Sequence, residues 1–159
     1  MMMLEIAATA LLLLQPAAAQ KAAPQKPAPQ KQPPAAKPAA TDLAVTVTYK
    51  GKGTVDAGHK IIVWLFADAS NLTSNSRPLD TQVVTKNGET IVFKNAPATP
   101  VHIFAVYDEK GGYDGISAPP PHGIPSSVYK KGPKGPPLAV KAGGPAIKLT
   151  FDDSERWNK

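Results

Sequence analysis

The segment from residue 108 to residue 114 has the residue types and the spacing of a loop that binds calcium. Such a loop places oxygen ligands at alternate positions, with glycine where the chain turns sharply. Asp108 and Asp114 fit the first and last ligand positions, and Glu109 lies beside Asp108. Lys110 and Gly112 stand where further oxygen ligands are needed, and a lysine ammonium repels a divalent cation. The segment therefore predicts either a calcium or other metal site formed by Asp108, Glu109 and Asp114, or a hairpin turn with solvated carboxylates.

Residues that would carry out covalent catalysis are sparse. The chain has no cysteine, which excludes a thiol nucleophile and a zinc–thiolate site, and it has no Gly-x-Ser-x-Gly motif. Ser117, Ser126 and Ser127 have no obvious base beside them in the sequence, whereas an activated serine needs one within hydrogen-bond reach. Glycoside hydrolysis needs two opposed carboxylates, but those of residues 152–155 are clustered near the C-terminus. We expect a protein that is not an enzyme, with a small hydrolase as the remaining alternative.

A long Pro-rich stretch, residues 115–137, is the candidate recognition surface. Loops of this length are usually functional or disordered. This one carries Tyr129, Lys130, Lys131 and Lys134 among its prolines. Basic and aromatic side chains together could bind an anionic glycan or a partner protein. The alternative is a Pro-rich crossover that packs against the domain and has no ligand.

The positive charge of the chain is concentrated in one segment. The formal net charge is +6, and four of the lysines lie within residues 20–40. A nucleic-acid-binding domain carries a basic patch interleaved with aromatic residues on the fold itself, and residues 41–159 show no such pattern. We therefore expect no nucleic-acid partner.

The N-terminus has the order of segments that marks a protein for export. Residues 6–14 form a short apolar run, Gln15 and Pro16 break it, and three alanines follow as a signal-peptidase site. The run is shorter than the ~20 residues of a spanning helix, although residues 1–5 lack the usual basic residue. The pattern predicts a signal peptide over residues 1–19, with an uncleaved N-terminus as the alternative. We expect a bacterial protein that is exported to the periplasm or the extracellular space and has no stable membrane span.

Residues 20–40 contain only Pro, Lys, Ala and Gln. A segment without aromatic or β-branched residues cannot bury enough apolar surface to fold. We expect a disordered linker there, followed by one domain over residues 41–159. The linker would be an inert spacer, or it would also bind weakly to an anionic cell-wall polymer.

In the domain, apolar and polar residues alternate along short segments, as they do in β-strands. Residues 43–49 alternate in the manner of a half-buried strand, and residues 61–67 are apolar on both faces, as in a central strand covered on both sides. Asn87-Gly88 between two β-rich runs indicates a two-residue type I′ hairpin. We expect an all-β fold, an antiparallel β-sandwich of the immunoglobulin or prealbumin type with about seven strands. The expected strands are residues 43–49, 61–67, 81–85, 90–93, 100–107, 138–140 and 146–151.

Several of these strands carry motifs that resemble a known group of sandwiches. Residues 64–66 and the Phe-Lys-Asn-Ala-Pro motif in residues 91–97 resemble the prealbumin-like, carboxypeptidase-regulatory-like domains, with residues 98–100 in place of that group's Gly-x-Tyr. Residues 106–114 and 123–125 resemble a family of bacterial exported sandwiches of unknown function. The resemblance implies a prealbumin-like sandwich over most of the domain.

Together these patterns favour a non-enzymatic exported envelope protein, a β-sandwich that binds or braces a partner. A cell-wall polymer or an envelope protein is the expected partner, and the oligomeric state is open. The alternative is a calcium- or other metal-binding periplasmic protein that uses the loop of residues 108–114. No cofactor other than calcium is expected.

Overall fold

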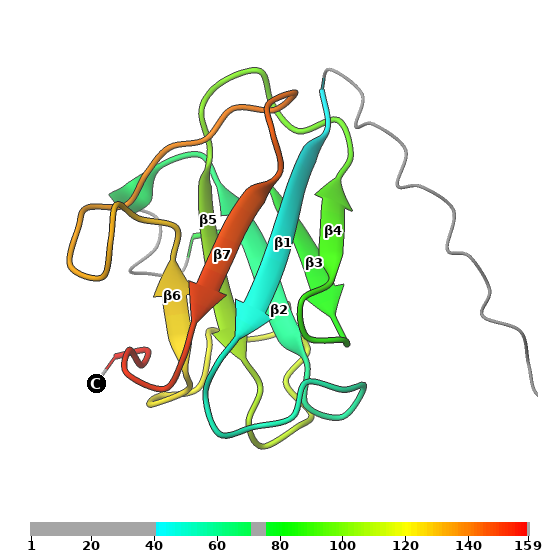
Figure 1. The fold of residues 1–159 in the computed structure, drawn as a ribbon, viewed down its shortest axis with the longest axis vertical. Helices are drawn as coiled ribbons and strands as arrows, with labels where there is room; N and C mark the ends of the chain where they lie inside the picture. Colours follow the sequence, from blue (N-terminus) through cyan, green and yellow to red (C-terminus); the bar gives the residue numbers. More distant parts are fainter. Residues whose placement is uncertain (1–40, 71–75, 159) are drawn as a thin grey trace, which may run out of the picture. The chain divides into compact units, whose positions relative to one another are not determined.

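The computed structural model describes residues 41–70 and 76–158, which form seven strands in two sheets. One sheet has the order β4-β1-β7 and the other the order β3-β2-β5-β6 (Figure 1). The all-β sandwich is therefore confirmed. The predicted signal peptide, residues 1–19, and the predicted linker, residues 20–40, lie outside the described residues. The strands are β1 Leu43–Tyr49, β2 Ile61–Phe66, β3 Asp80–Val84, β4 Thr90–Phe93, β5 His102–Tyr107, β6 Ser126–Val128 and β7 Ile147–Phe151.

One strand pair departs from the expected antiparallel arrangement. β7 pairs with β1 in parallel, with Val47 opposite Leu149, while the other pairs between named strands are antiparallel. Parallel neighbours need a long crossover connection. Here the two parallel neighbours are the first and last strands, and the chain between them passes through both sheets, so the connection is long enough.

The predicted type I′ hairpin at Asn87-Gly88 is wrong. β3 and β4 belong to different sheets, and only Gly88 of the two turn residues has a positive φ, at 79°. The Asn87 side chain accepts a hydrogen bond from the Tyr49 amide (2.8 Å) and donates one to the Tyr49 carbonyl (2.8 Å). The connection is therefore an arch between the sheets, anchored on the end of β1.

The sixth strand lies elsewhere than predicted. Residues 126–128, inside the expected Pro-rich loop, pair with β5. The expected strand at residues 138–140 makes only an isolated bridge, Val101 to Val140. Pro136 and Pro137 precede that short run, and prolines lack the amide that a regular ladder needs.

The core between the sheets follows the predicted alternation. Leu43, Val45, Val47 and Tyr49 of β1 all point into it, opposite the side chains of β2 and β5 that lie on the inner face. Burial of such side chains is the main favourable contribution to folding. The inner residues of β2 and β5 are Ile61, Val63, Leu65, Ile103, Ala105 and Tyr107.

The outer face of the four-stranded sheet is apolar as well. Ile62, Trp64 and Phe66 of β2 form a second buried cluster with Phe104 and Val106 of β5. The prediction that β2 is covered on both faces is confirmed, because all six of its residues are buried. Within residues 41–70 and 76–158 no second sheet covers this outer face, and loops and the C-terminal segment pack against it instead.

Leu65→Ala should lower the free energy of unfolding by about 2–5 kcal/mol, because it empties a site that is fully buried between the sheets. Leu79→Ala is the matched control, since Leu79 is 49% exposed. The same deletion there should cost less than about 1 kcal/mol. Urea denaturation measures both variants, and equal losses of stability would contradict this description of the core.

Candidate binding pocket

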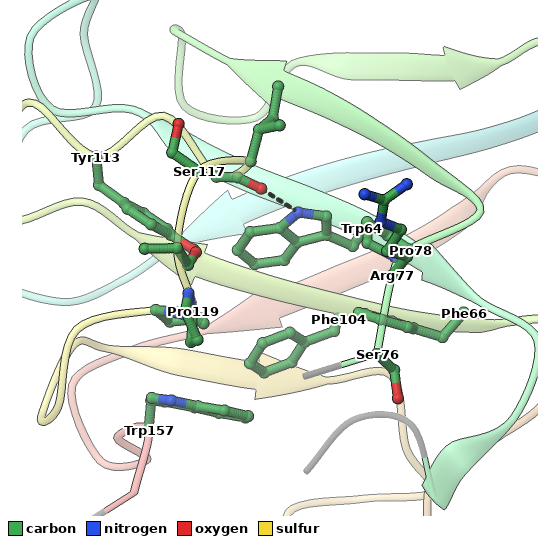
Figure 2. Close-up of a pocket in the computed structure, with 14 residues that line it drawn as sticks. Trp64, Phe66, Ser76, Arg77, Pro78, Phe104, Tyr113, Ser117, Pro119 and Trp157 are labelled. Carbon is green, nitrogen blue, oxygen red and sulfur yellow. Dashed lines mark hydrogen bonds between the residues drawn. The ribbon is translucent and has the colours of Figure 1, made fainter. Parts of the chain in front are cut away.

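A pocket of about 290 Å³ lies on the outer face of the four-stranded sheet (Figure 2). The aromatic residues of β2 and β5 form its floor, and residues 76–78, residues 113–120 and Trp157 surround it. Concave, mainly apolar surfaces of this kind are where proteins bind small ligands or anchor groups, and this volume is near the lower end of the usual ~300–1,000 Å³. Its aromatic lining residues are Trp64, Phe66, Phe104, Tyr113 and Trp157.

The floor of the pocket is a set of interlocked rings. Trp64 and Phe104 are direct partners in the β2–β5 register. Their rings stack with centroids 5.5 Å apart and planes at 18°. Trp157 approaches Phe104 in a tilted arrangement at 5.2 Å. Each such pair contributes about 0.5–1.5 kcal/mol beyond its burial, so the floor is held in place before any ligand arrives.

Residues 113–120, the covering segment, are held on this floor by Trp64 and are braced internally by Tyr113. The Trp64 Nε1–H donates to the Gly115 carbonyl (2.9 Å), and the Tyr113 hydroxyl donates to the Ala118 carbonyl (2.9 Å). Burial raises the pKa of Tyr113 to about 12, so its hydroxyl keeps its proton at neutral pH. Gly115 has a φ of 76°, and a Cβ there would lie 2.6 Å from Cγ2 of Ile62. Only glycine allows this close approach.

Two carboxylates shape the covering segment. Asp108 is buried and accepts a hydrogen bond from the Tyr113 amide (2.8 Å), which fixes where the segment begins. Asp114 accepts from the Ser117 hydroxyl and from the amides of Ile116 (2.9 Å) and Ser117 (3.0 Å). These donors lower the pKa of Asp114 to about 2. Both acids therefore act as structural acceptors within the segment.

The predicted metal ligands Asp108, Glu109 and Asp114 have these other partners instead. Glu109 forms an ion pair with Arg156 (3.1 Å), while Asp108 and Asp114 accept from backbone amides. Within residues 41–70 and 76–158, no group of three or more Asp, Glu, His or Cys side chains could hold a metal ion. Calcium binding stays a prediction, and this arrangement gives it no support.

The rim of the pocket carries a single charged lining residue. Arg77 is exposed and lines the pocket beside Ser76 and Pro78 (Figure 2). It makes no ion pair with any residue in the part of the chain that the structure describes. The pocket thus combines an apolar floor with one cation at its edge.

The four predicted recognition residues differ in their burial and in their contacts. Tyr129 is half-buried against the inner core, and Lys130 forms an ion pair with Glu155. These two line a hollow of about 460 Å³ between β6 and β7, while Lys131 and Lys134 are exposed outside its lining. The crossover alternative, in which this stretch packs against the domain, describes Tyr129 and Lys130 better.

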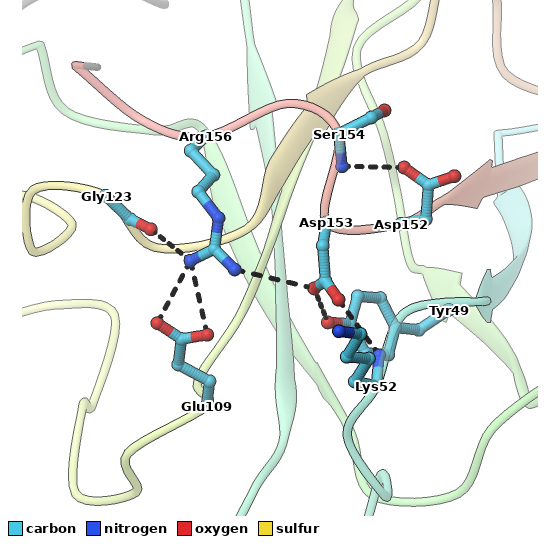
Figure 3. Close-up of polar contacts among 8 residues, drawn as sticks. All are labelled: Tyr49, Lys52, Glu109, Gly123, Asp152, Asp153, Ser154 and Arg156. Atoms are coloured by element: carbon cyan, nitrogen blue, oxygen red, sulfur yellow. Dashed lines mark hydrogen bonds and ion pairs between the residues drawn. The ribbon is translucent and has the colours of Figure 1, made fainter.

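Residues 153–157, the C-terminal strap, bring Trp157 to the pocket. The Ser126 amide donates to the Glu155 carbonyl (3.0 Å), and the Trp157 amide donates to the Ile124 carbonyl (2.9 Å). Arg156 donates to the Gly123 carbonyl (2.6 Å) and to Glu109 (Figure 3). The strap therefore pairs with residues 123–126, at the start of β6.

Asp153 ties the other end of the strap to β1. It accepts hydrogen bonds from the Tyr49 hydroxyl and the Lys52 amide (3.0 Å), and Arg156 lies 3.8 Å away (Figure 3). Burial and the neighbouring Asp153 raise the pKa of Tyr49, whereas the Tyr49 hydroxyl and the Lys52 amide lower the pKa of Asp153. A protonated tyrosine and an ionised aspartate are thus both favoured.

The pocket was not among the predicted sites, although its signal is in the sequence. Trp64 and Phe66 alternate with inward residues on β2, and Phe104 does so on β5. Aromatic side chains on the outer face of a central strand indicate a covered surface. The pairing of β2 with β5 would by itself have predicted the aromatic floor. Tyr113 and Trp157 are distant in sequence and reach this floor only through loop contacts.

No protein-family model, curated protein or solved structure matches this chain. The resemblance to prealbumin-like domains stays an expectation. In the described part of the chain, no helix has the length and apolar character to cross a membrane.

Acid should weaken the strap through Asp153. A carboxylate whose pKa is lower in the folded state stabilises the fold above its unfolded pKa, and this stabilisation is lost as the pH falls through the folded value. Because the pKa of Asp153 lies below its ordinary 3.8, wild-type stability should fall more steeply below about pH 4 than that of Asp153→Asn. Chemical denaturation across that range measures the slopes, and parallel slopes would contradict the assignment.

Gly115→Ala should lift the covering segment from the floor, because its Cβ meets Ile62 and Trp64. Gly112→Ala is the matched control: its φ of 88° is also positive, but a Cβ there meets nothing within 4 Å. Gly115→Ala should therefore cost about 1–3 kcal/mol more than the control and shift tryptophan emission to the red. Identical stability and emission in the two variants would show that the segment is not seated on Trp64.

Proposed function

We propose that this chain is a non-enzymatic, exported binding protein and that the aromatic pocket is its binding site. The observation that carries this proposal is that aromatic and proline side chains from several segments line one open cavity. Both tryptophans of the chain line that cavity, together with two phenylalanines, a tyrosine and three prolines. A domain that needed only stability would close such a surface.

Exposed apolar side chains around the pocket support this proposal. Among the described residues, the large hydrophobic side chains that remain exposed are Leu79, Val83 and Ile116. Val83 is the partner of Ile62 in the β2–β3 register and so lies on the outer face, as does Leu79 by strand alternation. Ile116 lines the pocket and is 80% exposed. Apolar surface gathered on one side of a domain is typical of an interaction site.

The chemistry of the lining supports binding rather than catalysis. Among the described residues that line the pocket, none is Asp, Glu, His or Lys. Ser117 lies at the wall, and its hydroxyl donates to Asp114. A carboxylate with a pKa of about 2 is a weak base at neutral pH. It would not activate this serine, which argues against the small-hydrolase alternative.

The apolar lining of the pocket also favours one class of partner over another. A charged cell-wall polymer would need several polar groups, whereas the pocket offers aromatic rings and one guanidinium. A protein of the bacterial envelope is therefore the better partner. The predicted signal peptide and linker are consistent with a domain displayed outside the cytoplasm.

Titration with N-phenyl-1-naphthylamine, an uncharged apolar fluorophore, tests the site. Because both tryptophans line the pocket, a bound probe should accept energy from them and saturate at one site per chain. Ile116→Glu should weaken probe binding by at least about fivefold, since it places a charge beside the ligand. Ala139→Glu adds the same charge at an exposed position outside the lining and should leave the affinity unchanged.

Two results would contradict the proposal. One is the absence of saturable binding to the folded wild-type protein. The other is equal weakening by Ile116→Glu and Ala139→Glu, which would place the probe on a general surface. Thermal unfolding of both variants checks that the fold is unchanged.

A further inference from the structure

We propose that the pocket binds a proline-rich segment of a partner protein in the polyproline II conformation, with an acidic residue of that segment paired to Arg77. This inference rests on the proposed function and names the ligand class of the same site. Three observations carry it: the prolines of the covering segment that line the cavity together with the aromatic rings, the apolar space beside them, and the charge at the rim.

The covering segment brings a proline run of this chain to the same cavity as the aromatic rings. An indole N–H and a phenol hydroxyl donate to backbone carbonyls, from Trp64 to Gly115 and from Tyr113 to Ala118. Ala118 is followed by three prolines, whose fixed φ favours polyproline II. The chain thus places a proline run against aromatic rings within its own structure. Aromatic-lined grooves bind proline-rich partners in the polyproline II conformation.

The open space beside that segment suits proline rings. The cavity of about 290 Å³ is lined by Trp64 and Phe104 of the sheet, by Trp157 of the strap, and by Pro119 and Pro120 of the covering segment. Proline brings an apolar ring and no amide N–H, so its burial leaves no donor unsatisfied. A polyproline II strand is also ordered before binding, which reduces the entropy cost. The volume fits a few rings of a longer chain, and the exposed Ile116 at the wall extends the contact surface.

The charge at the rim selects among proline-rich segments. Arg77 is exposed at the pocket and makes no ion pair within the described ranges. Asp114, the acid of the covering segment, is engaged by Ser117 and the amide of Ile116. The edge of the pocket is therefore complementary to an acidic side chain, and a lysine beside the prolines would be repelled.

A glycan is the competing class of ligand, and the lining favours it less. Sugars offer many hydroxyls and need a matching number of polar partners. The polar side chains that line the described pocket are Ser76, Arg77 and Ser117, and the last already donates to Asp114. The Trp64 indole N–H and the Tyr113 hydroxyl also donate within the chain.

Three synthetic peptides of equal length test the inference on the full chain. The first is octaproline followed by two glutamates, the second is octaproline followed by two lysines, and the third has glycine and serine in place of the prolines and keeps the glutamates. Binding is measured by tryptophan emission and by displacement of N-phenyl-1-naphthylamine. The acidic proline peptide should bind saturably and displace the probe, about twofold to fivefold more tightly than the lysine peptide. The glycine–serine peptide should not bind.

Arg77→Glu provides the charge-reversal control. The side chain is exposed, so the variant should keep the wild-type melting temperature. It should reverse the preference between the two proline peptides. An unchanged preference would overturn the assigned role of Arg77, and with it the acidic partner.

The remaining outcomes separate this inference from the proposed function. If the probe binds but neither proline peptide displaces it, the proline inference is wrong and the binding pocket stands. If soluble peptidoglycan fragments displace the probe and the proline peptides do not, the ligand is a glycan and the inference is again overturned. If the probe itself does not bind, both proposals fail together.

Discussion

The need to cover the second apolar face of β2 and β5 governs the architecture around the pocket. Ile62, Trp64 and Phe104 point away from the inner core, and no sheet of the described part of the chain lies over them. Leaving such rings in water would forfeit about 25 cal/mol for each Å² of apolar surface. The chain uses the covering segment and the C-terminal strap for this purpose. These two elements do not fill all the space above the aromatic rings, so a cavity remains between them.

Polar contacts hold the covering elements in place. Asp108 fixes the start of the covering segment through the Tyr113 amide. Asp153 and Arg156 fix the strap through Tyr49, Glu109 and the carbonyl of Gly123. The carboxylates that suggested a metal site from the sequence therefore position the aromatic walls. Together with the main-chain hydrogen bonds between the strap and residues 123–126, they hold these loops on an apolar sheet face.

The strand faces were predictable from the sequence, and the partners of several strands were not. Alternation over residues 43–49 and the two-sided apolar run of β2 identify inner and outer side chains correctly. Periodicity does not say which strands pair, and Asn87-Gly88 indicates a hairpin by local rules that the contact with Tyr49 overrides. The pocket was missed for the same reason. Tyr113 and Trp157 reach it through long-range contacts that have no local pattern.

The most direct test of the central claim is an NMR measurement of contacts between the bound acidic octaproline peptide and the rings of the pocket. The account predicts intermolecular nuclear Overhauser effects from proline ring protons to the indole of Trp157 and to the ring of Tyr113. It also predicts a chemical-shift change at the Trp64 indole N–H. Contacts to Tyr129 in their place, or a bound peptide that leaves both indoles unchanged, would contradict it.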